Sequence, residues 1–358
     1  MDKKIKTIAI AAAAMVAVGL LLAGVGYAAG GNQPINIDGT GIHIGDWENG
    51  SGKGNASAAI SGKQKTFEEK LNPFSSIKTD INLYPVELIA GDEYAIEGVY
   101  DTGLGKPEYT VKDGTLIIEA RNDTIFNVGK KSSINFGGQN SKLGVKVYYP
   151  KGTKLNDVNI KASAADLSFK GIVADSAEFN IGLGGLELGD ISAKTIKVSL
   201  GAGDCLLTGL KADNLDITNQ LGETTLKKTE AKTLTAKSFS GDVIFSDVTA
   251  EQGTLELDLG ELSAENLKTQ GLTAKNQSGD IILKGMLLGD TDITSSLGTV
   301  SVSPGASEDQ FNYELKTSLG TVTAGENESS SSIKVKNEAK NTIKISASLG
   351  DIEVQFGK

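Results

Sequence analysis

The chain has 358 residues and a formal net charge of -10, with 44 glycines and only 5% aromatic residues. This acidic balance argues against a nucleic-acid-binding protein, because phosphate recognition depends mainly on a surplus of Lys and Arg. One Cys and one His exclude a disulfide framework within the chain and disfavour zinc binding or Cys/His catalysis.

The N-terminal segment is basic and then apolar. Lys3, Lys4 and Lys6 precede an uncharged run of 22 residues from Ile8 to Ala29. About 20 such residues cross a bilayer, and the Lys cluster stays in the cytoplasm. Residues 1–29 are therefore predicted to anchor the chain in the cell membrane as a single pass, with the rest extracytoplasmic. A cleaved signal peptide is the competing interpretation, since Gly26-Tyr27-Ala28 fits a small-x-small site.

Residues 30–66 are rich in Gly, Ser and Asn, as in Gly50 to Asn55, and are predicted to form a flexible linker. Residues 67–358 are predicted to form the folded domain. Its first part, residues 67–162, is strand-like without a fixed period. Asp113-Gly114 separates two alternating apolar runs and predicts a β-hairpin. We expect this part to form opening coils that cap the stack described next.

A short glycine-centred motif recurs every 19 residues from residue 165 to 302. A fixed period of this length is typical of stacked repeats. The residues two and four positions after the glycine are mostly apolar, which indicates a strand with alternating faces, and a second alternating run follows. We therefore predict an all-β, single-stranded β-solenoid (β-helix) with 19-residue rungs stacked about 4.8 Å apart. The repeated glycines are Gly184, Gly203, Gly222, Gly241, Gly260, Gly279 and Gly298.

The position directly before the glycine alternates between Leu and a small residue. We interpret this alternation as packing, in which large side chains fill the space left by small ones in neighbouring rungs. The residues are Leu183, Ala202, Leu221, Ser240, Leu259, Ser278 and Leu297.

The spacing loosens towards the C-terminus. Gly320 follows Gly298 by 22 residues, and Gly350 follows 30 residues later. The extra residues, at 304–310 and 326–341, are predicted to be loop insertions in terminal rungs. The last apolar residues, Ile352 to Phe356, are predicted to end the stack.

Several motifs in fixed order give the chain a family resemblance. They are the apolar N-terminal span ending at Gly30-Gly31, the Phe74-to-Ile77 entry, the Tyr109-to-Leu116 hairpin, the Val147-to-Pro150 strand and the repeated Ser-Gly-Asp-Val rungs. Over about residues 67–356 the chain resembles the bacterial "putative adhesin" domain of unknown function, which includes LiaG-like membrane-anchored envelope proteins. The resemblance implies a tethered extracellular β-solenoid and supplies no catalytic residues.

An acidic column follows the glycines and is the strongest candidate site. Stacking in register would place its carboxylates in a line, where they could hold Ca²⁺ or meet a cationic surface. The alternative is turn chemistry, with each Asp bonding the local backbone and its charge in water. The column comprises Asp166, Asp204, Glu223, Asp242, Glu261, Asp280 and Asp351.

No catalytic or cofactor-binding residue is predicted. Cys205 falls in an inward column and is interpreted as a structural thiol. We expect a non-catalytic, adhesin-like binding protein of the cell envelope, whose partner is an unidentified envelope component or membrane protein. One alternative is an accessory or sensory partner of a membrane-embedded stress or transport system. A more distant one is a polysaccharide-active enzyme, which would need two suitably spaced carboxylates.

Overall fold

The computed structural model describes residues 35–38, 41–44, 63–120 and 143–357. Two short antiparallel strands, β1 (Ile35–Asp38) and β2 (Gly41–Ile44), fall within the stretch predicted as a linker and form a unit of their own. None of the described helices is long and apolar enough to cross a membrane. The predicted anchor, residues 1–29, lies outside the described residues.

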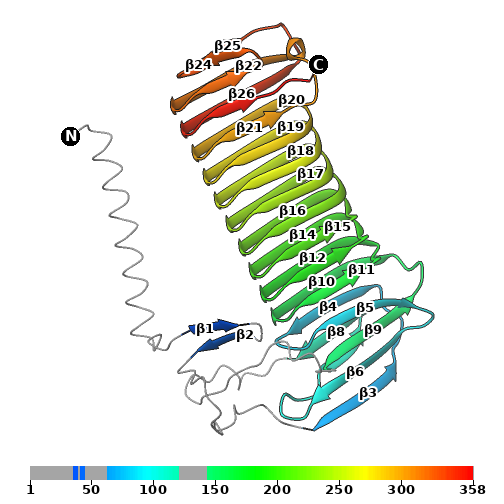
Figure 1. Cartoon of the computed structure of the whole chain (residues 1–358). Coiled ribbons are helices and arrows are strands. Elements are labelled where there is room, and N and C mark those ends of the chain that lie inside the picture. Colours follow the sequence, from blue (N-terminus) through cyan, green and yellow to red (C-terminus); the bar gives the residue numbers. More distant parts are fainter. Residues whose placement is uncertain (1–34, 39–40, 45–62, 121–142, 358) are drawn as a thin grey trace. The chain divides into compact units, whose positions relative to one another are not determined.

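The remaining described residues are almost entirely β-strands, which confirms the predicted all-β class. The strands of the regular region stack in parallel, as Figure 1 shows. Paired residues are 19 positions apart: Leu207 pairs with Leu226, and Leu226 pairs with Phe245. The strands are β10 (Leu155–Ala164), β11 (Leu167–Lys170), β12 (Ala174–Leu183), β13 (Leu186–Gly189), β14 (Ser192–Ala202), β15 (Cys205–Thr208), β16 (Lys211–Leu221), β17 (Thr224–Ser240), β18 (Val243–Leu259), β19 (Leu262–Ser278), β20 (Ile281–Leu297) and β21 (Val300–Ser303).

One continuous hydrophobic core runs along the inside of the stack. Leu207, Leu226 and Phe245 are at most 1% exposed, as the alternation predicts. The second alternating run is buried as well, for example Leu215 and Ile217. Each fully buried side chain of this size contributes about 2 kcal/mol. Because like residues lie over like residues, the core is a set of columns, and each coil depends on its two neighbours.

The repeated glycines form a turn column in which the coils approach most closely. Gly222 has a φ of 128°, a conformation that L side chains rarely adopt. A Cβ atom on Gly222 would lie 2.2 Å from the carbonyl oxygen of Gly203, one coil earlier. The same close approach recurs at Gly241, where the distance to the Gly222 oxygen would be 2.1 Å. Only glycine therefore fits this position in successive coils.

Polar side chains inside the core satisfy carbonyl groups of the glycine turns. Buried Asn219 donates from Nδ2 to the carbonyl oxygens of Gly203 (3.1 Å) and Gly222 (3.2 Å). Asn276 makes the equivalent bond to Gly260 at 2.9 Å. Such bonds offset the cost of burying an amide and of leaving a carbonyl unpaired. These inward polar residues hold the turn shape from within.

The N-terminal part of this unit extends and caps the stack, as predicted. Strand β4 pairs in parallel with β10 on one side and with β8 on the other, and β7 closes that edge as the antiparallel partner of β8. Asp113 and Gly114, with φ of 50° and 71°, make the predicted hairpin turn. A second sheet has the strand order β3-β6-β9-β5. In it β5 and β9 are parallel, whereas the pairs β9–β6 and β6–β3 are antiparallel. The strands are β3 (Gln64–Lys70), β4 (Ser76–Ile81), β5 (Val86–Gly91), β6 (Ala95–Asp101), β7 (Glu108–Lys112), β8 (Thr115–Ala120) and β9 (Gly144–Pro150).

The C-terminal part corrects one prediction. β26 pairs in parallel with both β20 and β22, and β27 lies between β21 and β23. The last strands of the chain are therefore inserted between two coils, and the prediction that they end the stack is wrong. The elements are η1 (Glu308–Gln310), β22 (Phe311–Leu319), β23 (Val322–Ala324), β24 (Asn327–Ser329), β25 (Ser332–Val335), β26 (Asn341–Leu349) and β27 (Ile352–Val354).

The insertion has a physical reason. The Ser-rich stretch predicted to be a loop contains β24 and β25, which pair antiparallel with β23 and β22 and cover the outer edge of the stack. A polar antiparallel edge resists pairing with other chains better than an apolar one. The apolar C-terminus is buried instead, with the Phe356 ring 5.2 Å from Tyr313.

Gly222→Ala is expected to destabilise the solenoid strongly. The new Cβ combines backbone strain with a clash against the Gly203 carbonyl, so the expected loss is about 3 kcal/mol or more in free energy of unfolding. The control is Gly171→Ala, where φ is 68° but nothing lies within 4 Å of the added Cβ; it should lose only about 1 kcal/mol. Urea unfolding followed by circular dichroism measures both. Equal losses in the two variants would contradict the close approach of the coils.

Hydrogen–deuterium exchange tests the inserted coil. Amides of β26 are expected to exchange at least about 100-fold more slowly than those of the edge strand β25, because β26 is paired on both sides. The protection of β20 serves as the internal reference. Exchange of β26 at the rate of β25 would show that the last strands lie at an edge.

Candidate functional site

The acidic column lies along the turn edge of the stack, and the structure brings its members together coil by coil. The backbone N–H of Cys205 donates to the carbonyl oxygen of Glu223 at 2.8 Å, and that of Thr224 donates to Asp242 at 2.9 Å. The same bond links Val243 to Glu261 and Leu262 to Asp280. All five carboxylates from Asp204 to Asp280 are exposed. Gly185 separates Asp166 from this run, and Thr299 separates Asp351 from it.

The Asp residues of the column tie one coil to the next. Asp204 accepts a hydrogen bond at Oδ1 from the backbone N–H of Glu223, 3.0 Å away, and Asp242 accepts one from Glu261 at 2.8 Å. Turn chemistry predicts a bond from each Asp to its local backbone, whereas in the structure the bond is made to the neighbouring coil. The same contact joins Asp166 to Gly185, Asp280 to Thr299 and Asp351 to Thr321.

The column keeps its negative charge at the surface. Among the described residues, no ion pair includes any of its carboxylates. Within the same part of the chain, no group of three or more His, Cys, Asp or Glu is placed to hold a metal ion. Calcium binding thus stays a prediction, and the arrangement itself is an array of like charges that attracts cations or cationic partners.

A row of exposed leucines runs beside the acidic column and corrects the packing interpretation. Leu183, Leu221, Leu259, Leu297 and Leu319, here called the leucine ridge, are 57%, 51%, 49%, 50% and 57% exposed. They point outward because the glycine turn breaks the strict alternation of the strand. The residue three before the glycine is buried and so is the residue two after it, while the intervening side chains face solvent, as at Asn219, Leu221, Glu223 and Thr224.

Leucine and aspartate alternate between coils. Leu221 pairs with Ser240, and Ser240 pairs with Leu259, so leucines of the regular region occupy every second coil. Coils with a small residue before the glycine have Asp after it, as in Ser240-Gly241-Asp242, whereas Leu221-Gly222-Glu223 shows the other form. The pattern of this edge therefore repeats every two coils, or 38 residues, and the sequence shows the same alternation of Leu with a small residue.

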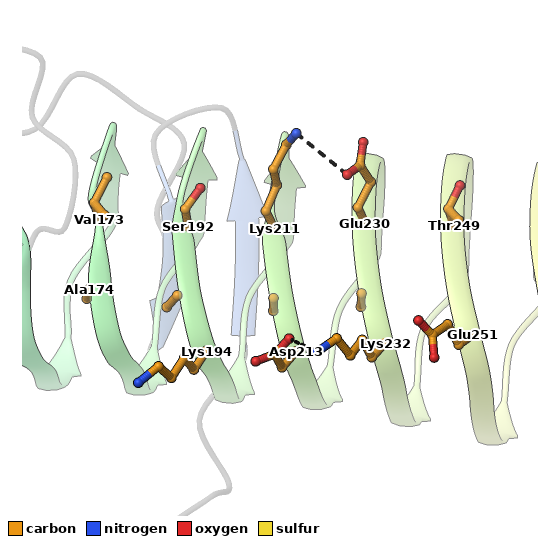
Figure 2. Close-up of a pocket in the computed structure, with 13 residues that line it drawn as sticks. Val173, Ala174, Ser192, Lys194, Lys211, Asp213, Glu230, Lys232, Thr249 and Glu251 are labelled. Carbon is orange, nitrogen blue, oxygen red and sulfur yellow. Dashed lines mark ion pairs between the residues drawn. The ribbon is translucent and has the colours of Figure 1, made fainter.

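A shallow groove of about 660 Å³ crosses the strands at another position on the coil, as Figure 2 shows. Its floor is the column of small side chains that includes Ala174 and Ala212. Rows of longer side chains flank it, and their charges pair between coils: Lys232 lies 2.7 Å from Asp213, and Lys211 lies 3.5 Å from Glu230. Because its charges are of both signs and are paired, this groove attracts a charged partner less strongly than the acidic column does.

Cys205 is buried, in agreement with the interpretation as a structural thiol. It is 1% exposed, and burial raises its pKa to about 12. A thiol with this pKa is almost fully protonated at neutral pH, which leaves little of the nucleophilic thiolate.

The Toastrack DUF4097 family matches residues 74–355, and the chain belongs to this family of "putative adhesin" domains of unknown function. The match includes both ends of the stack as well as the regular coils. A search of curated proteins found no relative of the chain.

Three solved structures of low sequence identity are similar to the chain. A putative adhesin from Parabacteroides distasonis has a TM-score of 0.40 at 13% identity and covers 82% of this chain and 98% of its own. One from Parabacteroides merdae has a TM-score of 0.38 at 15% identity, covering 83% and 97%. A third, from Bacteroides fragilis, has a TM-score of 0.32 at 14% identity, covering 83% and 99%.

Replacing Asp204 and Asp242 by Ala is expected to lower stability by about 1 kcal/mol for each lost hydrogen bond. The matched control replaces both by Asn, which keeps an Oδ1 acceptor in place and should retain most of the stability. Urea midpoints of the three proteins give the comparison. If the Asn and Ala variants lose the same amount, the carboxylates act through their charge and not as acceptors for the next coil.

Proposed function

We propose that the chain is a cell-envelope protein whose β-solenoid, one coil per 19-residue repeat, is a non-catalytic binding surface outside the membrane. The observation that carries the proposal is the turn edge, where exposed carboxylates and exposed leucines recur on a stack held by continuous backbone pairing. A rigid array of repeated groups binds extended partners at little cost in ordering entropy.

A binding role fits the chemistry of the edge better than a catalytic one. Asp204, Asp242 and Asp280 each accept a backbone hydrogen bond from the next coil, which is a structural task. The carboxylates also recur in equivalent surroundings, while glycosidases use two carboxylates with different roles. The repeated edge is suited to multivalent contact, in which many weak interactions add up.

Membrane attachment is the second part of the proposal. The basic residues Lys3, Lys4 and Lys6 and the apolar run to Ala29 support an uncleaved single-pass anchor with a cytoplasmic N-terminus. Residues 30–66 would then act as a spacer between the membrane and the solenoid. This arrangement exposes the turn edge to the cell wall, to neighbouring membrane proteins and to molecules from outside.

Deletion of residues 1–30 is expected to move the protein from the membrane fraction to the soluble fraction without loss of binding. Tagged full-length and deleted proteins would be incubated with the solubilised envelope of the bacterium that encodes them, with and without calcium, and the captured components identified. A component held by both proteins, and lost when Glu223 and Glu261 become Gln, supports the proposal.

Three results would contradict it. Capture that requires residues 1–30 would favour an accessory partner of a membrane-embedded system. Release of new reducing ends from cell-wall glycans would indicate an enzyme. If no component is captured in any preparation, the proposed binding surface loses its support.

A further inference from the structure

The leucine ridge is an apolar feature with a regular spacing. Successive leucines from Leu183 to Leu297 are two coils apart, which is about 9.6 Å at one strand spacing per coil. Phe239, 53% exposed, precedes Ser240 in the coil between Leu221 and Leu259 and adds apolar surface there. Single exposed leucines are common, but a row on one edge marks an interaction surface.

Half-buried Leu349 lies beside the C-terminal members of the leucine ridge. Leu349 pairs with Leu297 on one side and Leu319 on the other, so three leucines occupy adjacent coils. This continuity depends on the inserted strand β26, which supplies Leu349. The apolar row therefore extends across the irregular coils and is not confined to the regular repeat.

The charge beside the ridge identifies the class of partner. Glu223 and Glu261 lie two residues after Leu221 and Leu259, and Asp204, Asp242 and Asp280 occupy the coils between the leucines. These carboxylates are exposed, and no ion pair among the described residues neutralises them. A partner must therefore carry apolar side chains flanked by cations. A second copy of this acidic chain would instead bring like charges together.

The spacing identifies the conformation of the partner. In an α-helix, residues seven positions apart lie on one face and are separated by about 10.5 Å along the axis. Over three leucines the mismatch with the ridge is about 2 Å, which side chains absorb. In an extended strand, same-face residues are about 6.8 or 13.6 Å apart, and neither matches the ridge.

We propose that the leucine ridge binds a basic amphipathic helix, whose apolar side chains, seven residues apart, lie against alternate coils while its Lys or Arg residues face the acidic column. This proposal rests on the proposed function, since it names the partner class of the same binding edge. The helix lies along the stack and covers at least Leu221, Leu259 and Leu297.

The test uses the full-length chain in nanodiscs of zwitterionic lipid, with empty nanodiscs as the blank. The probe is a fluorescent Ala-based helix of about 18 residues with Leu at every seventh position and Lys on both flanks. Two control peptides have the same composition in scrambled order, or Glu in place of Lys. Fluorescence anisotropy gives the dissociation constants at low and high salt.

The variants follow the protein's own alternation. Leu221→Ser with Leu259→Ser introduces the residue found at Ser240 and Ser278 in the same column, so the fold should be retained, as circular dichroism can verify. Met286→Ser, at an exposed apolar residue away from the ridge, is the matched control. Glu223→Gln with Glu261→Gln removes charge alone.

We expect the Lys probe to bind and both control peptides to bind at least tenfold more weakly. The double Leu variant should lose at least tenfold in affinity, the double Gln variant should lose affinity and salt dependence, and Met286→Ser should match the wild type. The proposal would be overturned if the Lys probe does not bind, or if it binds the double Leu variant as tightly as the wild type. Binding of the Glu peptide as tight as that of the Lys probe would also overturn it. Self-association abolished by the Leu substitutions would also overturn it and assign the ridge to a second copy.

The outcomes separate this inference from the broader proposal. If an envelope component is captured by the full-length chain but the probe is not bound, the helix inference fails and the binding function stands. If neither binds, both fail.

Discussion

The close approach of successive glycine turns is the constraint on which the rest of the structure depends. A Cβ at Gly222 or Gly241 would meet the carbonyl oxygen of the preceding coil at 2.2 or 2.1 Å. The turn therefore accepts glycine alone, and its backbone conformation is repeated from coil to coil. With the turn fixed, the strands on both sides pair residue for residue, and the apolar columns of the core follow from that register.

The same turn determines which side chains reach solvent. Strict alternation would send every second residue inward, but the glycine turn places a short segment outside. The leucine ridge and the acidic column both belong to this segment, while Asn219 and Asn276 stabilise the turn carbonyls from inside. A single conformational requirement thus yields a rigid edge on which apolar and negative groups recur, and this is the physical basis of the proposed binding role.

The regular region could be predicted from the sequence because its period is fixed. An inward or outward position assigned in one repeat therefore holds in the others. The inward positions of Leu207, Phe245 and Cys205 and the hairpin at Asp113-Gly114 all follow from alternation and turn chemistry. The outward direction of Leu221 and Leu259 does not follow from the sequence, because residue type does not give direction where the alternation is broken. The position of β26 between β20 and β22 does not follow from the sequence either, because a strand can join any compatible edge and the order of strands in the stack can differ from their order in the chain.

The most direct test of the account is a set of distances between spin labels on the ridge. Buried Cys205 should resist labelling, so pairs of cysteines can replace Leu221 with Leu297 and Leu183 with Leu297. Electron paramagnetic resonance should give separations of about 19 and about 29 Å, one strand spacing for each coil, with the mobile spectra of exposed sites. Separations that do not grow with the number of coils, or immobilised labels, would contradict the stacked glycine turns and the outward ridge.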